Sequence, residues 1–241
     1  MRASLHTGVL EQLGQRIVRG ELPVGAVVTL AGLEAELGVS RSVVREVVRV
    51  LESIGMVESR QRVGVRVQPA GDWDHFDPRL IRWRLNGPQR GEQLRHLLEV
   101  RAAVEPVAAR LAAQRADDAT TDALAGLASR IHQLGDAGLG TSPEYLAADI
   151  AFHGLLLAAG GNPMLASLAD AVAEVLSGRT SLGLMPGDPN PKALDHHDAI
   201  AQAIRVGDED AAEYHARAIV MEVWDAVVES DRLAGVPNSS K

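Results

Sequence analysis

The sequence contains no cysteine, and aromatic residues make up only 3% of its 241 residues. The lack of cysteine excludes disulfides, thiolate zinc sites and cysteine nucleophiles, and it is consistent with a reducing compartment. The longest apolar run, near residues 155–159, is far too short for a signal peptide or a membrane span. We therefore expect a cytoplasmic protein without a membrane-spanning segment, in which any metal is held by His, Asp or Glu.

The net charge of −8 is unevenly distributed along the chain. Residues 1–70 contain nine Arg and seven Glu, a net charge of +2, whereas the remainder has 15 basic and 25 acidic residues, a net charge of −10. The positive charges of the first part concentrate between Arg41 and Arg66. Only this part therefore has the charge expected of a nucleic-acid-binding segment.

Ser40 predicts the start of a helix in which Arg41, Arg45 and Arg49 recur at four-residue steps. At about 100° per residue, these three arginines spread over only about 80° of the helix surface. Four apolar side chains gather on the opposite side: Val44, Val47, Leu51 and Ile54. One face can therefore pack while the other stays cationic. Taken alone, the pattern is also that of an ordinary amphipathic helix with a solvated arginine face.

The flanking segments predict a winged helix-turn-helix domain over residues 1–68. Two helices precede the arginine-bearing one, the first at about residues 4–19 and a short second one after the cap residue Thr29. After Gly55, residues 57–67 alternate between apolar and polar, which predicts a β-hairpin. The hairpin carries the residues of a basic wing with a turn glycine: Arg60, Arg62, Gly64 and Arg66.

The rest of the chain makes the predicted fold class mostly α. Residues 69–78 contain two prolines and a glycine without sustained periodicity, which indicates a linker. Residues 79–234 are rich in Ala and Leu at helical spacing and predict an antiparallel all-α bundle of six or seven helices. The expected helices span about residues 79–85, 91–115, 117–134, 142–159, 163–177, 192–206 and 208–229. Residues 235–241 are expected to form a disordered tail.

Three residues of the second domain have a spacing that suits a metal site. Asp149 and His153 lie four residues apart on one predicted helix, so they project from the same face, and His197 lies on a later helix. If they converge inside the bundle, they could hold a divalent ion such as Zn, Ni, Mn or Fe. An isolated Asp and His at this spacing is more often a surface pair. A metal-dependent hydrolase using this cluster is the competing function, although the sequence has no phosphate-binding loop or serine elbow to support it.

Three segments of the first domain resemble the winged helix-turn-helix of GntR-type bacterial regulators: IVRGELPVG, LEAELGVSRSVVREVVRVLESIGMVESR and VGVRV. In that family the arginines of the SR..VRE element and of the wing tip touch DNA. By position, the resemblance implies DNA contacts by Arg41, Ser42, Arg45, Arg49, Arg62 and Gly64. Arginine suits both guanine and phosphate contacts, and a glycine lets the wing approach the minor groove closely. Ala31 stands where many relatives carry an arginine, so the operator sequence cannot be transferred.

The second domain resembles the all-helical FCD effector domain of the FadR branch of this family. The motifs are EVRAAVEPVAARLAA, ADIAFHGLLLAAGGNPML and HHDAIAQAIRVGDEDAA. Metal-binding members use the residues that match Asp149, His153 and His197, together with a histidine on the last helix. That last position is Ile219 here, and His215 stands one turn earlier. The resemblance therefore implies a metal held either by three residues or by these three and His215.

Two arginines of the second domain are candidates for binding an effector. Arg101 occupies a position that often faces the effector cavity in the family, and its alternative role is a helix salt bridge to Glu105 at the i+4 spacing. Arg179 is the second candidate, with a solvated loop residue as its alternative. Arginine is the natural partner of a carboxylate because the pairing is bidentate.

The segment WDHFDPRLIRWRL resembles the corresponding part of regulators of gluconate and galactonate catabolism. This resemblance implies a sugar acid as effector, while simple packing is the alternative role of Trp73 and Trp83. The sequence thus predicts a homodimeric DNA-binding transcription regulator, acting as a repressor. Its partners would be a palindromic operator in double-stranded DNA and a small carboxylate, the latter bound in the helical domain with a divalent metal.

Overall fold

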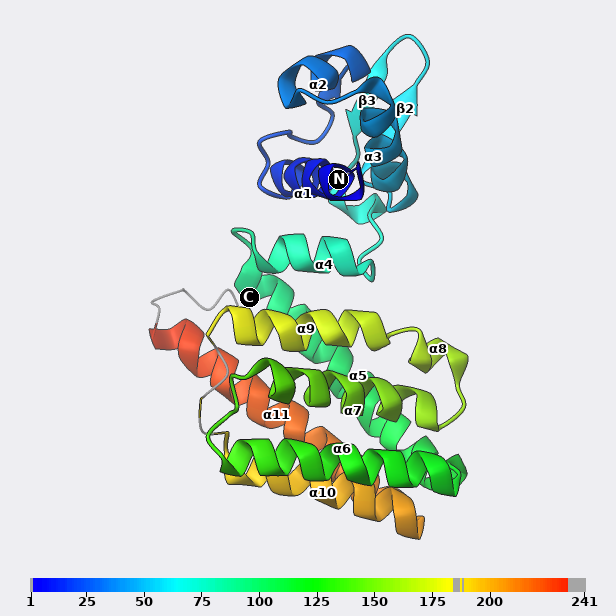
Figure 1. Ribbon diagram of the computed structural model, residues 1–241, viewed down its shortest axis with the longest axis vertical. Helices are drawn as coiled ribbons and strands as arrows, with labels where there is room; N and C mark the ends of the chain where they lie inside the picture. The colour runs from blue at the N-terminus through cyan, green and yellow to red at the C-terminus, as the bar shows by residue number, and fades with distance from the viewer. Residues whose placement is uncertain (1, 184–186, 188, 234–241) are drawn as a thin grey trace. The chain divides into compact units, whose positions relative to one another are not determined.

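The computed structural model describes the backbone of residues 2–183, 187 and 189–233, and the side chains of residues 6–183, 187 and 189–224. The chain forms two compact units, Met1–Arg90 and Gly91–Lys241 (Figure 1). The predicted fold class is confirmed: the first unit is a winged helix-turn-helix, and the second consists of helices throughout its described part. The expected tail, residues 235–241, lies outside the described residues.

The N-terminal unit combines four helices and a small sheet. In chain order its elements are α1 (Arg2–Val18), β1 (Val27–Val28), α2 (Leu30–Leu37), α3 (Arg41–Ser53), β2 (Val57–Arg60), β3 (Gly64–Val67), a short 3-10 turn (Ala70–Asp72) and α4 (Pro78–Leu85). The antiparallel sheet has the order β1-β3-β2, and β2 and β3 form the wing, with Val57 opposite Val67. The sequence did not predict β1, because two residues cannot show an alternating pattern.

The predicted apolar faces of α1 and α3 form the core of this unit. The buried side chains include Val9, Leu10, Leu13 and Ile17 of α1, Val44, Val47 and Leu51 of α3, and Val57, Val65 and Val67 of the wing. The Thr29 hydroxyl caps α2 by accepting a hydrogen bond from the Gly32 N–H at 3.0 Å, and the left-handed Gly38 ends that helix. The packing of α3 against α1 and α2 leaves the arginine face of α3 exposed.

The segment after the wing packs on the N-terminal unit, and so does α4. The Trp73 indole N–H donates to the Gln68 carbonyl at 3.1 Å, and Trp83 is fully buried with its indole N–H donating to Glu11 at 2.6 Å. The Trp83 ring lies so close to Gly14 of α1 that a Cβ there would be 2.5 Å from it. The first unit extends to Arg90, and Trp83 of α4 belongs to its core.

The C-terminal unit is the predicted antiparallel bundle. Its helices are α5 (Arg90–Arg115), α6 (Asp118–Asp136), α7 (Pro143–Ala159), α8 (Pro163–Ala166), α9 (Ala169–Ser181), α10 (Pro191–Val206) and α11 (Glu209–Leu233). Asp117 and Ser142 cap α6 and α7 as expected, each accepting a hydrogen bond from the backbone N–H three residues later. The expected single helix over residues 163–177 is instead divided into α8 and α9. Pro106 lies inside α5 without ending it.

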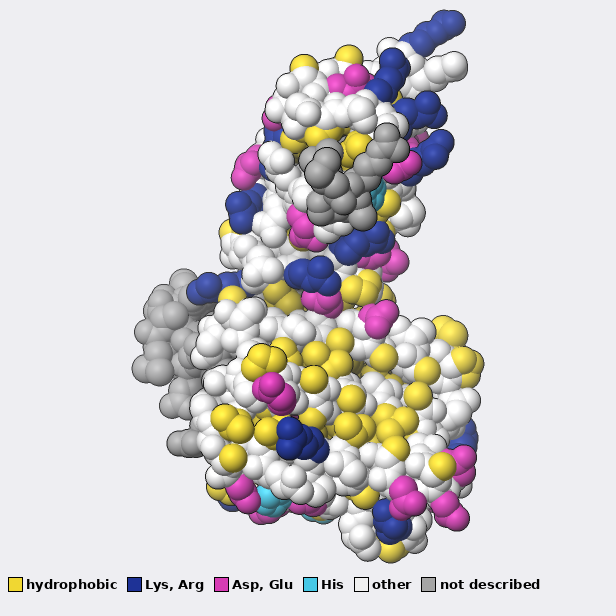
Figure 2. Space-filling view, in the orientation of Figure 1, with side chains coloured by type: hydrophobic (Ala, Val, Ile, Leu, Met, Phe, Trp, Pro, Cys, Tyr) yellow, Lys and Arg dark blue, Asp and Glu magenta, His cyan; other side chains and the backbone are white. Residues whose placement is uncertain are grey.

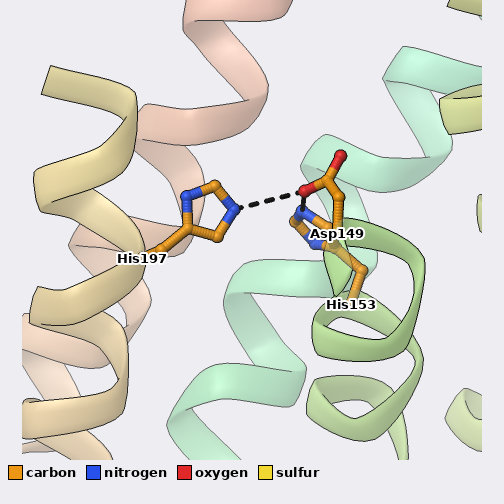
Figure 3. A group of neighbouring side chains, drawn as sticks. All are labelled: Asp149, His153 and His197. Carbon is orange, nitrogen blue, oxygen red and sulfur yellow. Dashed lines mark ion pairs between the residues drawn. The ribbon is translucent and has the colours of Figure 1, made fainter. Parts of the chain in front are cut away.

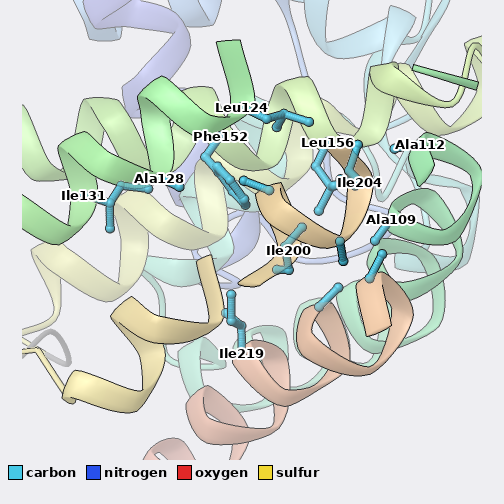
Figure 4. Close-up of a cluster of buried hydrophobic side chains, with 14 of the residues drawn as sticks. Ala109, Ala112, Leu124, Ala128, Ile131, Phe152, Leu156, Ile200, Ile204 and Ile219 are labelled. Carbon is cyan, nitrogen blue, oxygen red and sulfur yellow. The ribbon is translucent and has the colours of Figure 1, made fainter. Parts of the chain in front are cut away.

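The core of the bundle is made by α5, α6, α7, α10 and α11 (Figure 4). Phe152 and Leu156 of α7 pack there with Ile200 and Ile204 of α10 and with Ile219 of α11. Ile219 is 5% exposed, so the last helix contributes an apolar side chain to the core at the position where the resemblance to metal-binding members implied a histidine ligand. Among the described residues, no helix has both the length and the apolar character to cross a membrane.

Candidate functional site

The exposed face of α3 and the wing present the arginines that the sequence singled out. Arg45, Arg49 and Arg62 are exposed and make no ion pair within the described part of the chain. Arg41 is also exposed, but its guanidinium lies 3.7 Å from Glu34 of α2. Figure 2 shows basic side chains gathered on the edge of this unit that carries α3 and the wing. Three free cationic groups on one edge suit contacts with phosphates and guanines.

The wing is held to α3 by a carboxylate. Glu52, in the last turn of α3, accepts a hydrogen bond from the Ser59 N–H of β2 at 2.6 Å. At the tip, Arg62 has a positive φ of 64°. Gly64 begins β3 with a φ of 121°, and a Cβ there would be 2.6 Å from the Val28 carbonyl oxygen. Close packing of β3 on β1 is therefore a reason for this glycine within the domain itself.

Ser42 lies beside these arginines at the start of α3. Its hydroxyl is exposed and lies 2.9 Å from the hydroxyl of Ser40, which is at the N-cap position without capping the helix through its side chain. Both hydroxyls therefore stay at the exposed N-terminal end of α3, where backbone N–H groups favour an anion such as a phosphate.

The helical bundle brings together Asp149 and His153 of α7 and His197 of α10 (Figure 3). All three are buried, and their ligand atoms lie within 4.8 Å of one another. Asp149 Oδ1 lies 3.4 Å from His153 Nε2 and 3.4 Å from His197 Nε2. The structure thus places a carboxylate oxygen and two imidazole nitrogens around one point, and we call these three residues the inner cluster.

Hydrogen bonds outside the inner cluster fix the orientation of both imidazoles. His153 Nδ1 lies 2.9 Å from Glu105, and His197 Nδ1 lies 2.7 Å from the Ala193 carbonyl oxygen. Each Nδ1 thereby has a partner outside the inner cluster, and each Nε2 faces Asp149. Metal-binding histidines are oriented in this way in proteins. His197 Nε2 is buried and has no hydrogen-bond partner in the described structure, so these residues fit a divalent metal.

Glu105 links the inner cluster to Arg101. Both side chains are buried, with Arg101 Nε 2.5 Å from Glu105 Oε1 and Nη2 3.2 Å from Oε2. Burial alone would raise the pKa of Glu105, but the charges of Arg101 and His153 lower it to about 2. Arg101 thus forms the i+4 salt bridge considered from the sequence, yet its Nη1 is buried without a hydrogen-bond partner. The guanidinium therefore keeps a donor available beside the cluster.

Arg179 lies in α9 and not in a loop. Its Nε is buried without a hydrogen-bond partner in the described structure. Burial, followed by the charge of Arg101, lowers its pKa to about 10, whereas the electrostatic effect of Asp149 opposes this shift. Asp149 itself stays ionised: burial would raise its pKa, but the neighbouring imidazoles of His153 and His197 bring it well below its usual range. Arg101 and Arg179 are thus two cations that a bound carboxylate could neutralise.

His215 does not join the inner cluster. Its Nδ1 lies 2.9 Å from Nδ1 of His196, one residue before His197 on α10. The side chain of Ile219, one turn later on α11, is buried in the core, whereas His215 lies against His196. The sequence also missed the role of Glu105, since a glutamate four residues from an arginine indicates only a helix salt bridge until its burial is known.

A winged helix-turn-helix followed by an all-helical domain is the architecture of a class of DNA-binding transcription regulators. The chain belongs to the GntR family of bacterial regulatory proteins: residues 5–67 match that family, and residues 96–221 match the FCD domain. It is 31% identical over 210 residues to the galactonate operon transcriptional repressor of Escherichia coli K12, covering 86% of this chain and 90% of that protein. It is a transcription regulator and not an enzyme.

Further relatives agree with this assignment. The chain is 34% identical over 206 residues to the HTH-type transcriptional regulator YieP of Escherichia coli K12, covering 84% of this chain and 86% of that protein. Two solved structures share the fold. The Listeria monocytogenes regulator Lar has a TM-score of 0.58 at 16% identity, covering 93% of this chain and 96% of Lar. Escherichia coli McbR/YncC has a TM-score of 0.53 at 16% identity, covering 94% of this chain and 98% of McbR/YncC.

Proposed function

We propose that this chain is a homodimeric repressor whose winged helix-turn-helix binds a palindromic operator and whose inner cluster binds a small carboxylate through a divalent metal. The observation that carries the proposal is the inner cluster, in which two imidazoles are oriented by Glu105 and the Ala193 carbonyl so that Nε2 of each faces Asp149. A metal ion there would attract the carboxylate and hydroxyl oxygens of a ligand. His215 is not included among the ligands.

The proposed carboxylate would be bound by two arginines. Arg101 Nη1 and Arg179 Nε are both buried without hydrogen-bond partners, and a buried donor without a partner is costly. A carboxylate would satisfy these donors and neutralise charge next to Asp149. We propose a sugar acid in particular, because hydroxyl groups beside its carboxylate would add ligand oxygens. The name of the Escherichia coli relative, a galactonate operon repressor, supports the same class.

A thermal-shift measurement tests the effector. Saturation at about 100 times the dissociation constant should stabilise the protein by about 2.7 kcal/mol, which corresponds to roughly 5–10 °C in melting temperature. We expect galactonate or gluconate together with Zn²⁺ or Mn²⁺ to give such a shift in the wild type. Asp149→Asn should abolish it, and Arg179→Gln should reduce it. The absence of any shift across metals and sugar acids would count against the effector.

DNA binding is proposed for Arg41, Ser42, Arg45, Arg49, Arg62 and Gly64. Arg45 is the sharpest test, because it is exposed near the start of α3 and free of ion pairs within the described structure. Arg45→Ala should weaken operator binding by about 1–3 kcal/mol, which is about 5- to 150-fold, in a fluorescence anisotropy titration. The control is Arg205→Ala on α10, an exposed arginine that pairs with Asp122. Equal affinities of the two variants would remove Arg45 from the DNA-binding residues.

The homodimer is proposed to form through an apolar face of the bundle. Figure 2 shows hydrophobic side chains gathered over α7, α8 and α9. Met164 is 75% exposed there, and Ile150 and Leu165 are only partly buried. We propose that a second copy of this chain covers this apolar face, because two winged helix-turn-helix domains are needed to bind a palindromic operator. Light scattering should give a dimer for the wild type and a monomer for Ile150→Lys, while Val206→Lys, at an exposed residue of α10, should stay dimeric.

A further inference from the structure

A second pair of imidazoles lies at the contact between α10 and α11. His196 and His215, which we call the outer pair, are partly exposed, and their ring centroids are 5.1 Å apart at an angle of 46°. Neither belongs to the inner cluster. Adjacent residues on a helix diverge by about 100°, so His196 projects away from His197. The operator-binding and effector-binding roles proposed above use neither residue.

The spacing of the outer pair suits two ligands of one metal ion. Nδ1 of His196 and Nδ1 of His215 are 2.9 Å apart. Imidazole nitrogens bind first-row metals at about 2.0–2.1 Å, so two of them at a right angle around one ion are about 2.9 Å apart. In the hydrogen bond that the rings now make, only one Nδ1 carries a proton. The other already presents a lone pair, and transfer of the proton from Nδ1 to Nε2 of the same ring would make both Nδ1 atoms available.

We propose that the outer pair is a second metal site, selective for borderline transition ions such as Cu²⁺, Ni²⁺ and Zn²⁺. Neutral imidazole is the preferred ligand of these ions, and partial exposure lets water complete the coordination. Asp195 next to His196 and Asp208 near His215 add negative charge, while Lys192 opposes it. With two protein ligands, the site should bind more weakly than the inner cluster. A bound ion would fasten α11 to α10, the helix that also carries His197.

The proposal is tested by metal titration of the full, untagged chain. Metal-stripped protein is titrated with Ni²⁺ by calorimetry, and Cu²⁺ is then used for electron paramagnetic resonance, which reports nitrogen ligands. We expect two classes of sites in the wild type. His196→Gln and His215→Gln should each remove only the weaker class and its two-nitrogen signal. His96→Gln, at an exposed histidine of α5, should keep both classes.

The inner-cluster variant Asp149→Asn separates this site from the proposed effector site. A weaker class that persists in Asp149→Asn but is lost in His215→Gln supports the outer pair, whether or not the inner cluster binds metal. The proposal is overturned if the weaker class survives in both outer-pair variants, or if only one of the two histidines is needed. It is also overturned if the only class observed disappears with Asp149→Asn. Melting curves of each variant confirm that it is folded.

Discussion

Replacing Glu105 with alanine is expected to lower the free energy of unfolding of the helical unit by about 3–5 kcal/mol and to weaken metal binding about 10- to 100-fold. The loss of stability arises because Arg101, only 1% exposed, would keep its charge in the core without the carboxylate that pairs with it. The loss of affinity arises because His153 would lose the group that accepts from its Nδ1. Urea unfolding and calorimetric metal titration measure the two effects separately.

The matched control for Glu105 is an exposed ion pair of the same bundle. Asp122→Ala breaks the pair with Arg205. Because the Asp122 side chain is 69% exposed and the Arg205 side chain 44% exposed, the substitution should cost less than about 1 kcal/mol. The folded-state pKa of Glu105 is about 2, below its ordinary 4.5, so the ionised carboxylate stabilises the fold above pH 4.5. The stabilisation of the fold by the Glu105 carboxylate should therefore fall as the pH drops from 4.5 toward 2. Equal costs of Glu105→Ala and Asp122→Ala would show that the buried pair has no special role.

Gly55→Ala is expected to destabilise the N-terminal unit by roughly 2–5 kcal/mol and to impair operator binding. Gly55 has a φ of +75°, and a Cβ there would be only 2.2 Å from the Asp72 carbonyl oxygen. The substitution therefore adds backbone strain and a clash with the segment that follows the wing. Because Gly55 connects α3 to β2, the clash should also displace the wing from the exposed face of α3. Chemical unfolding and operator titration check the two effects.

Gly20→Ala separates strain from clash. Gly20 has the same φ of +75°, but a Cβ there would meet no atom within 4 Å. Its substitution should cost only the strain of a left-handed residue, about 1–2 kcal/mol. The difference between the two variants measures how tightly residues 70–74 pack on the turn after α3. If Gly55→Ala cost no more than Gly20→Ala, that segment would be a loose linker, as the sequence suggested.

Periodicity and spacing predicted most of the fold and part of the site. The arginine face of α3 and the shared face of Asp149 and His153 follow directly from the 3.6-residue turn. What the sequence could not provide was the rotation of one helix against another. His215 was a candidate because it is one turn from Ile219, but the packing of α11 directs the isoleucine inward and the histidine toward His196.

Burial and long-range packing account for the other differences. The i+4 spacing of Arg101 and Glu105 is the same on a surface and in a core, so the contact of Glu105 with His153 could not be predicted from it. Composition predicted a linker over residues 69–78, with Pro69 and Pro78 at its two ends. The contacts of Trp83 with Gly14 and Glu11, across more than 60 residues of sequence, show that α4 packs with the DNA-binding unit.

Operator affinity with and without effector is the most direct test of the proposed regulator. The operator is selected from random DNA, and its affinity for the full chain is measured with and without Zn²⁺ and the sugar acid that gives the largest thermal shift. We predict that the ligand weakens binding by about 5- to 150-fold in the wild type. In Asp149→Asn, the unliganded affinity should match that of the wild type and the ligand should have no effect. An unchanged wild-type affinity, or an Asp149→Asn variant that still responds, would contradict the account.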